Sequence, residues 1–210
     1  LAEKYLDTFQ NAGLRPVAFE METHALARSL LPVAGGSVPV MLVDFGKTRT
    51  TFVIAVGGLV RFTSTVSVAG EALEHALAKA LKISLSEAEA VKKEKGLIKD
   101  KANEEVFNAL LPTVSAVADE IERHVMFWNT HAEHVHQSPP QISQIILSGG
   151  AANLIGFKEY LAQKVGISVA LGNIWMNVAP FNGYIPEIPF NESLRFAVTM
   201  GLALRATRGE

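Results

Sequence analysis

The chain has 210 residues, with 19 Lys or Arg against 21 Asp or Glu, and it contains no cysteine. This charge balance lacks the basic excess of a nucleic-acid-binding surface, and the missing thiols exclude disulfides and thiolate metal sites and fit a reducing compartment. No apolar run approaches the roughly 20 residues that cross a bilayer. The first residue is Leu1, already in helical periodicity, which we interpret as the start of a fragment of a longer protein.

Two helices and a short strand are predicted before the first linker. Apolar residues at helical spacing predict a first helix that ends at Gly13. Residues 17–19 are predicted as a strand, and residues 25–30 as a second helix that ends before Pro32. The stretch VAGGSVP, residues 33–39, favours turns and indicates a domain boundary.

Three strands are predicted after the linker, at residues 40–44, 50–56 and 59–68. The first strand is nearly all apolar, which is typical of a strand covered on both faces. Gly57-Gly58 between the second and third strands predicts a tight antiparallel hairpin. A helix is then predicted through residues 73–81 from its apolar spacing.

The middle of the chain, residues 84–136, has a helical and charged pattern. Ser86 is predicted to cap one helix, and an apolar stripe from Val106 to Trp128 predicts a long one. Pro112 lies inside this stripe, so the long helix is expected to kink or restart there.

Three histidines follow the long helix, and their spacing raises the question of a metal site. No carboxylate arrangement completes a ligand set, so we favour a solvated helix end, where a cationic imidazole is favourable. The residues are His131, His134 and His136.

Strand signals return after Pro140, in the sequence QISQIILSGG. A helix through residues 154–165, a short strand at 167–171 and a last helix at 194–202 follow. The helical middle is therefore interpreted as an insertion into a mixed α/β sheet domain.

The first candidate binding motif is DFGKTRTT, which begins where the first of the three strands ends. A carboxylate followed by a glycine turn lies at the mouth of a sheet, where open sheets bind ligands. Backbone N–H groups and hydroxyls can donate to phosphate, a cation can neutralise it, and Asp44 can hold a hydrated Mg²⁺. A plain hairpin with a polar turn is the alternative. The phosphate candidates are Gly46, Lys47, Thr48, Arg49, Thr50 and Thr51.

The second candidate motif is a glycine-rich turn between a strand and a helix. Its glycines allow a ring or a phosphate to approach the backbone, and the helix start adds N–H donors. A turn that serves packing alone is the alternative. The candidates are Ser148, Gly149, Gly150, Ala151 and Ala152.

The third candidate motif lies on the charged helix EAEAVKKEKG. Glu89 and Lys92 are three residues apart on one face, and Lys93 is adjacent. An exposed ion pair, worth a few tenths of a kcal/mol, is the alternative to a binding role.

Taken together and in this order, the three motifs resemble the actin-like ATPase superfamily, and most specifically the PilM family of type IV pilus assembly. In that family a D-x-G-x-x-x-T hairpin, an S-x-x-E-A-E-x-x-K helix and a GG turn occur in the same order. The resemblance extends over nearly the whole chain. The matching stretches are residues 44–51, 58–62, 68–70, 84–92, 149–169 and 201–205.

The resemblance implies a fold and a division into domains. The fold is α/β, the ribonuclease H-like second domain of an actin-like ATPase, with a mixed sheet, helices on both faces and a helical inserted subdomain. Residues 1–35 would be the C-terminal remnant of the first domain. Residues 36–82 and 138–210 would form the nucleotide-binding sheet domain, and residues 83–137 the insertion.

The resemblance also implies a function: a cytoplasmic protein that binds ATP or ADP with Mg²⁺ and is at most a weak ATPase. Asp44 would be the catalytic and Mg²⁺-binding residue, the hairpin loop would bind phosphate, the GG turn would bind the adenosine, and Glu89, Lys92 and Lys93 would flank the adenine. The protein would act as a nucleotide-dependent scaffold for inner-membrane pilus proteins.

Three further expectations concern what the sequence lacks and what else it could be. The family's first phosphate loop is not found, and the groove for the N-terminal peptide of a PilN-like partner is expected to be missing with it. A sugar or acid kinase of the same superfold is one alternative function, although no acid other than Asp44 is obviously placed as a general base. A degenerate scaffold that binds no nucleotide is another.

Overall fold

The computed structural model describes residues 2–33, 35–131, 140–178 and 185–208, so His134 and His136 lie outside the described residues. In chain order the elements are α1 (Ala2–Asn11), α2 (Glu22–Leu30), β1 (Val40–Phe45), β2 (Thr50–Val56), β3 (Leu59–Val66), α3 (Gly70–Leu81), α4 (Leu85–Lys95), α5 (Glu104–His131), β4 (Gln144–Ser148), the 3₁₀ helix η2 (Gly150–Asn153), α6 (Phe157–Val165), β5 (Ser168–Leu171), α7 (Phe190–Ser193), the 3₁₀ helix η3 (Leu194–Phe196) and α8 (Ala197–Arg208).

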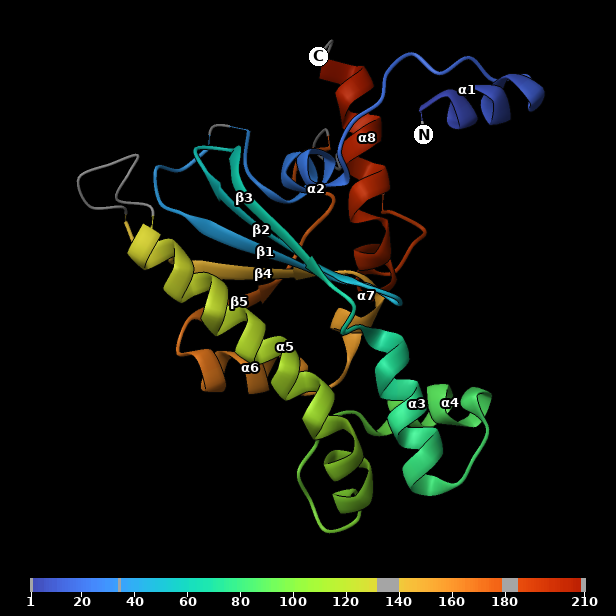
Figure 1. The fold of residues 1–210 in the computed structure, drawn as a ribbon, viewed down its shortest axis with the longest axis vertical. Helices are drawn as coiled ribbons and strands as arrows, with labels where there is room; N and C mark the ends of the chain where they lie inside the picture. The colour runs from blue at the N-terminus through green and yellow to red at the C-terminus, as the bar shows by residue number, and fades with distance from the viewer. Residues whose placement is uncertain (1, 34, 132–139, 179–184, 209–210) are drawn as a thin grey trace.

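The five strands form one mixed sheet in the order β3-β2-β1-β4-β5 (Figure 1). β1 pairs with β2 antiparallel and with β4 parallel, and β5 continues the parallel half. The predicted mixed sheet is confirmed. The predicted hairpin is also confirmed, because Gly57 and Gly58 both have positive φ and join antiparallel β2 and β3.

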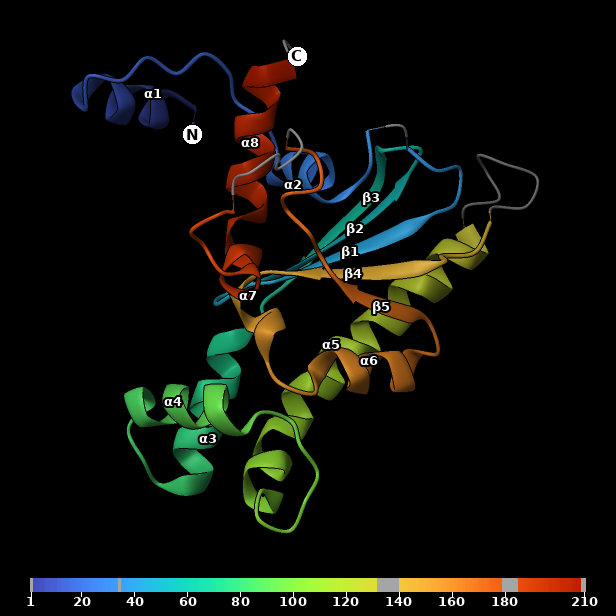
Figure 2. The ribbon, with the colours of Figure 1, turned by 180° about the vertical axis from the view of Figure 1, so that it is seen from behind.

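Helices cover both faces of the sheet, as predicted (Figures 1 and 2). α2 and α8 lie on one face, and α3, α5 and α6 lie on the other. Successive residues of β1 alternate between the two cores: Met41 and Val43 pack on the α3–α5 side, and Leu42 packs on the α2–α8 side. This double burial explains the uninterrupted apolar run in β1.

Two local predictions, a strand before α2 and the residue that caps α4, were wrong. Residues 17–19 form no strand: Val17 is 93% exposed, and an extended segment needs a neighbouring strand to form a ladder. α4 is capped by Ser84 and not by Ser86, through a capping box in which Ser84 and Glu87 bond reciprocally. Ser84 and Ser86 each precede a glutamate by three residues, so the sequence allows either cap. Ala88 is fully buried, which favours a helix that begins after Ser84.

The long helix α5 continues through Pro112 as a single element, so the predicted restart does not occur. Its apolar stripe faces the sheet and α3, as the periodicity indicated. Within the described part of the chain, no helix combines the length and apolar character needed to span a bilayer.

Candidate functional site

The first and second candidate motifs lie side by side at one end of the sheet. Because β1 and β4 are parallel neighbours, Asp44 and Ser148 are in register at the ends of their strands. The Ser148 hydroxyl donates to Oδ1 of Asp44 at 3.0 Å. Motifs that are 104 residues apart in sequence are thus joined by one side-chain hydrogen bond.

Gly149 is required by the close approach of the two strand ends. Its φ is +88°, and a Cβ there would lie 2.4 Å from the Phe45 carbonyl oxygen and 2.9 Å from Asp44 Oδ1. Its N–H donates to the Leu194 carbonyl at 3.0 Å. Any side chain at this position would push the turn away from β1.

The hairpin loop is held by its own backbone and by the start of α3. The Gly46 N–H donates to the Asp44 and Arg49 carbonyls, and the Gly46 carbonyl accepts from the Gly70 N–H at 2.9 Å. The Lys47 carbonyl accepts from the next amide of α3 at 2.8 Å. Gly46 therefore shapes the loop and has no N–H left for a ligand. Among the described residues, no hydrogen bond uses the N–H groups of Lys47 and Thr48.

The two threonines of β2 have different surroundings. Thr50 is fully buried, and its hydroxyl donates to the Val68 carbonyl at 2.5 Å, so it cannot also donate to a phosphate as predicted. Thr51 points to the opposite face, where it is in register with Asp44 and lies 3.4 Å from the hydroxyl of Thr65. A polar row of Ser148, Asp44, Thr51 and Thr65 therefore crosses the sheet on the α2–α8 face.

Burial raises the pKa of Asp44, and the nearby Glu22 carboxylate adds to the rise. The Ser148 hydrogen bond and the charge of Arg49 act in the opposite direction. No ion pair of Asp44 is found in the described part of the chain. Among the residues that the structure describes, no group of three or more His, Asp or Glu side chains could hold a metal ion, so Asp44 fits only a Mg²⁺ that keeps most of its water.

Glu22 is a site residue that the sequence interpretation missed. It is the first residue of α2, and its two carboxylate oxygens lie 2.8 and 2.7 Å from Nη2 of Arg49. Both side chains are exposed. Nothing in the local sequence pointed to Glu22, because its position depends on how α2 packs against α8 and the sheet.

The third motif forms ion pairs other than the Glu89–Lys92 pair that we considered as the alternative to a binding role. Lys92 bonds Glu74 of α3 at 2.5 Å, and both side chains are largely buried. Glu89 instead pairs with Lys93 at 2.7 Å on the exposed side of α4. The Lys93 hydrogen bond and charge lower the pKa of Glu89, with a smaller contribution from Lys47 of the hairpin loop.

The end of α4 contacts the segment that follows the GG turn. The Leu97 N–H donates to the Ile155 carbonyl at 2.7 Å, and a Cβ on Gly156 would lie 2.7 Å from the Leu97 carbonyl oxygen. Ala151 and Ala152 are buried, whereas Gly150 is exposed. The structure thus joins the hairpin loop to the GG turn, places the end of α4 against the segment after that turn, and leaves Gly150 as the exposed part of the turn.

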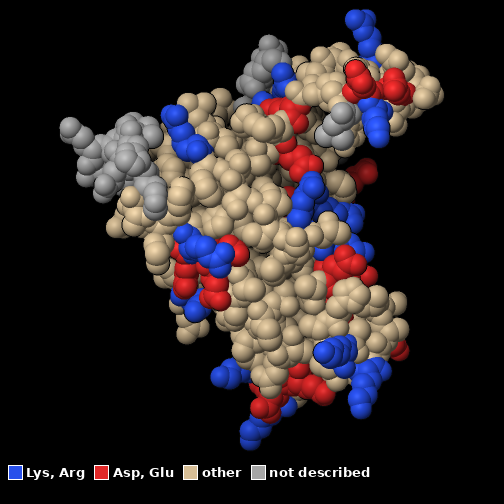
Figure 3. Space-filling model, in the orientation of Figure 1, with Lys and Arg blue, Asp and Glu red and all other residues tan. Residues whose placement is uncertain are grey.

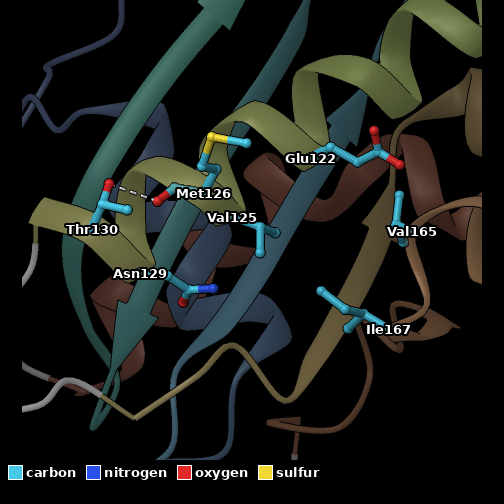
Figure 4. A pocket seen from close by; sticks show the side chains of 7 residues that line it. All are labelled: Glu122, Val125, Met126, Asn129, Thr130, Val165 and Ile167. Atoms are coloured by element: carbon cyan, nitrogen blue, oxygen red, sulfur yellow. Dashed lines mark hydrogen bonds between the residues drawn. The ribbon is translucent and has the colours of Figure 1, made fainter.

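A pocket of about 300 Å³ lies elsewhere, between α5 and the turn before β5 (Figure 4). Val125, Val165 and Ile167 point toward it, and Glu122 is on its rim. Its lining contains no cation and no glycine turn, and it contains the acidic Glu122, so it is poorly suited to bind phosphate. We therefore assign the candidate site to the loops and not to this pocket.

The sequence matches the family of the type IV pilus assembly protein PilM over residues 2–207. The chain belongs to this family. PilM-family membership agrees with the resemblance drawn from the three motifs, and it accounts for the order in which they occur.

Solved structures with this fold include other actin-like proteins. A structure of the PilM-PilN type IV pilus biogenesis complex matches with a TM-score of 0.78 at 24% identity, over 97% of this chain and 57% of that one. The ethanolamine utilization protein EutJ from Carboxydothermus hydrogenoformans matches with 0.66 at 23%, over 97% and 60%. MreB5 of Spiroplasma citri bound to ADP matches with 0.72 at 17%, over 99% and 65%. The actin-like ATPase fold is confirmed, and this chain spans about three-fifths of these relatives.

Proposed function

We propose that this PilM-family chain binds ADP or ATP with Mg²⁺ between the loops at residues 44–51 and 148–152 and acts as a nucleotide-dependent scaffold in type IV pilus assembly. The observation that carries the proposal is the contact of Ser148 with Asp44, which joins the two loops at one end of the sheet. The fold relative MreB5, solved with ADP, supports the choice of ligand. In this proposal residues 36–82 and 138–210 form the nucleotide-binding domain, and residues 83–137 the insertion.

The phosphates would be bound by the hairpin loop. The N–H groups of Lys47 and Thr48 are the backbone donors, and the Thr51 hydroxyl lies on the same face as Asp44. Arg49 would exchange the Glu22 carboxylate for a phosphate oxygen. A Mg²⁺ held through water by Asp44 would neutralise phosphate charge when bound.

The adenosine would lie against the GG turn and α4. Gly149 is buried and shapes the turn, so the exposed Gly150 would offer backbone without a side chain, and Glu89 with Lys93 would flank the base. Lys92 is left out of this contact, because its ammonium is already bonded to Glu74 in a largely buried pair.

The partner would be an inner-membrane protein similar to PilN, which is present in the PilM-PilN complex that this chain resembles. We place the chain at the cytoplasmic side of that membrane, held there through its partner. Nucleotide binding would shift the population of the partner-binding conformation.

Calorimetry with Mg-ADP and Mg-ATP tests the nucleotide site, on this chain and on any longer protein that contains it. We expect Asp44→Asn to weaken Mg-nucleotide binding by roughly tenfold or more, because it removes a charge-assisted contact. Asp119→Asn is the matched control, since Asp119 is exposed on α5 and pairs loosely with Lys164. Equal affinity of both variants would remove the basis of the proposal. Phosphate transfer to a panel of sugars would instead establish the kinase alternative.

A further inference from the structure

β3 is an edge strand of the sheet, and its outer side is open. It pairs with β2 along one side, and in the described part of the chain no other backbone group bonds to residues 59–66. Figures 1 and 2 show β3 at the border of the sheet. Such an edge presents unpaired N–H and C=O groups, which are a template for another strand.

The features that normally protect an edge are confined to one end of β3. A register shift between Ile54 and Ala55 places a bulge at that end, next to Arg61, which is the single charged residue of the strand. The other end, residues 62–66, has the sequence FTSTV, with no charge and no proline. Its β-branched and aromatic residues favour strand pairing.

This half of β3 is complementary to itself when two copies run antiparallel about Ser64. Phe62 then lies opposite Val66 of the second copy, on the face that carries α5. Thr63 lies opposite Thr65 of the second copy, on the other face. Aromatic with β-branched and threonine with threonine are cross-strand pairs that stabilise a sheet. Arg61 would face Ser67, so no like charges meet.

The surface beside this edge is apolar and partly uncovered. Phe127, on α5, is 44% exposed, and the centre of its ring lies 5.2 Å from that of Phe62. In the space-filling view, most of the surface along β3 carries no charged side chain (Figure 3). An added strand would place its Val66 next to these two rings and cover part of them.

We propose that β3 pairs with β3 of a second copy of this chain, antiparallel about Ser64, so that the two sheets become one continuous sheet. The occupant is a second copy because the sequence of the edge matches itself on both faces. A strand pair of this length buries less than a standard interface, so the dimer is expected to be weak and concentration-dependent.

Single-cysteine variants test the register, since the chain has no cysteine of its own. In Ser64→Cys the two thiols would face each other across the two-fold axis, so mild oxidation should give a disulfide-linked dimer. In Leu59→Cys, also on β3 and exposed, they would be about 33 Å apart, so only background cross-linking is expected. Equal cross-linking of the two variants would overturn the proposal.

Two matched double variants test the pairing in sedimentation equilibrium. Thr63→Lys with Thr65→Lys sets ammonium groups opposite each other between the copies, and should weaken self-association by roughly tenfold or more. Thr63→Lys with Thr65→Glu sets opposite charges there and should retain it. Circular dichroism and the melting temperature would establish that both variants fold.

A wild-type chain that stays monomeric at the highest soluble concentration would overturn the proposal, as would a lysine double variant that associates as well as the wild type. A monomer that captures an extended peptide along β3 would show that the edge binds a different strand, and would also reject a second copy as its occupant.

Discussion

Gly201 of α8 lies directly against the backbone of Ala25 in α2: a Cβ on Gly201 would stand 1.8 Å from the Ala25 carbonyl oxygen. The Gly201 carbonyl also accepts from Arg28 of α2 at 3.1 Å. Because the opposing atom is backbone, α2 and α8 must move apart to admit a methyl group. We expect Gly201→Ala to lower the free energy of unfolding by roughly 3 kcal/mol, measured by urea denaturation.

Gly36→Ala is the control for this substitution. A Cβ on Gly36 would meet no atom within 4 Å, and its φ is not in the left-handed region. Its stability should therefore stay within about 1 kcal/mol of the wild type. A Gly201→Ala protein as stable as Gly36→Ala would contradict the helix contact.

The ionised carboxylate of Asp44 should lower the free energy of unfolding, although it is proposed to bind Mg-nucleotide. Burial raises its pKa, so its ionised form destabilises the folded state at neutral pH. The protonated carboxyl of Asp44 stabilises the folded state. This stabilisation is fully present below pH 3.8 and is lost as the pH rises through the pKa of the folded state. We expect Asp44→Asn to raise the free energy of unfolding at pH 7 by about 1 kcal/mol, although it weakens nucleotide binding. Urea denaturation at pH 7 measures this, and a destabilised variant would contradict it.

The strands and the two glycine loops could be predicted because their signals are local. The apolar run of β1 ends at the charged loop, and Gly57-Gly58 lies between the two strands that it joins. The family resemblance, and not the local sequence, led us to expect that the motifs share a site, and the parallel pairing of β1 with β4 brings Asp44 and Ser148 together.

The ion pairs could not be predicted, since each depends on how separate elements pack. Lys92 has one acidic neighbour at helical spacing, Glu89, but it reaches Glu74 because α3 packs against α4. Thr50 was predicted to donate to phosphate, but its hydroxyl donates to the carbonyl of Val68, which follows β3 in the chain. Sequence spacing predicts on which face of a helix or strand a side chain lies, but not which residue of a neighbouring element it contacts.

Arg28 and Glu20 form a largely buried ion pair that attaches the segment before α2 to that helix. Their two hydrogen bonds are 2.6 and 2.9 Å long, and the side chains are 12% and 7% exposed. Arg28→Leu would leave the Glu20 carboxylate buried without its bidentate partner, with Arg205 3.6 Å away. We expect a loss of roughly 3–5 kcal/mol in the free energy of unfolding.

The double variant Arg28→Leu with Glu20→Leu is the matched control, and it should recover most of this loss because no charge remains buried. The pH dependence provides a second test. Hydrogen bonding to Arg28 lowers the pKa of Glu20, so the pair contributes stability above pH 4.5 that is lost as the pH falls through the folded pKa. If Arg28→Leu kept the same acid dependence as the wild type, the pair would not be its source.

His124 of α5 should make the fold sensitive to mild acid. Its ring is packed 4.7 Å from Phe52 and 5.3 Å from Phe62, and Nε2 is buried with no hydrogen-bond partner among the described residues. Burial lowers its pKa, and the charge of Arg123 adds to this, while Glu120, 3.9 Å from Nδ1, opposes it. The folded state therefore disfavours the proton, so stability is full above pH 6.5 and falls as the pH drops below it.

Replacing His124 by Leu keeps an apolar side chain between the two phenylalanines and removes the titrating group. Urea denaturation between pH 7.5 and 5 should therefore show a smaller loss of stability in His124→Leu than in the wild type, because below pH 6.5 the wild type alone must bury a proton or release the ring. His75→Gln, at an exposed position on α3, should keep the wild-type profile. Parallel profiles for His124→Leu and the wild type would show that this ring does not control the acid response.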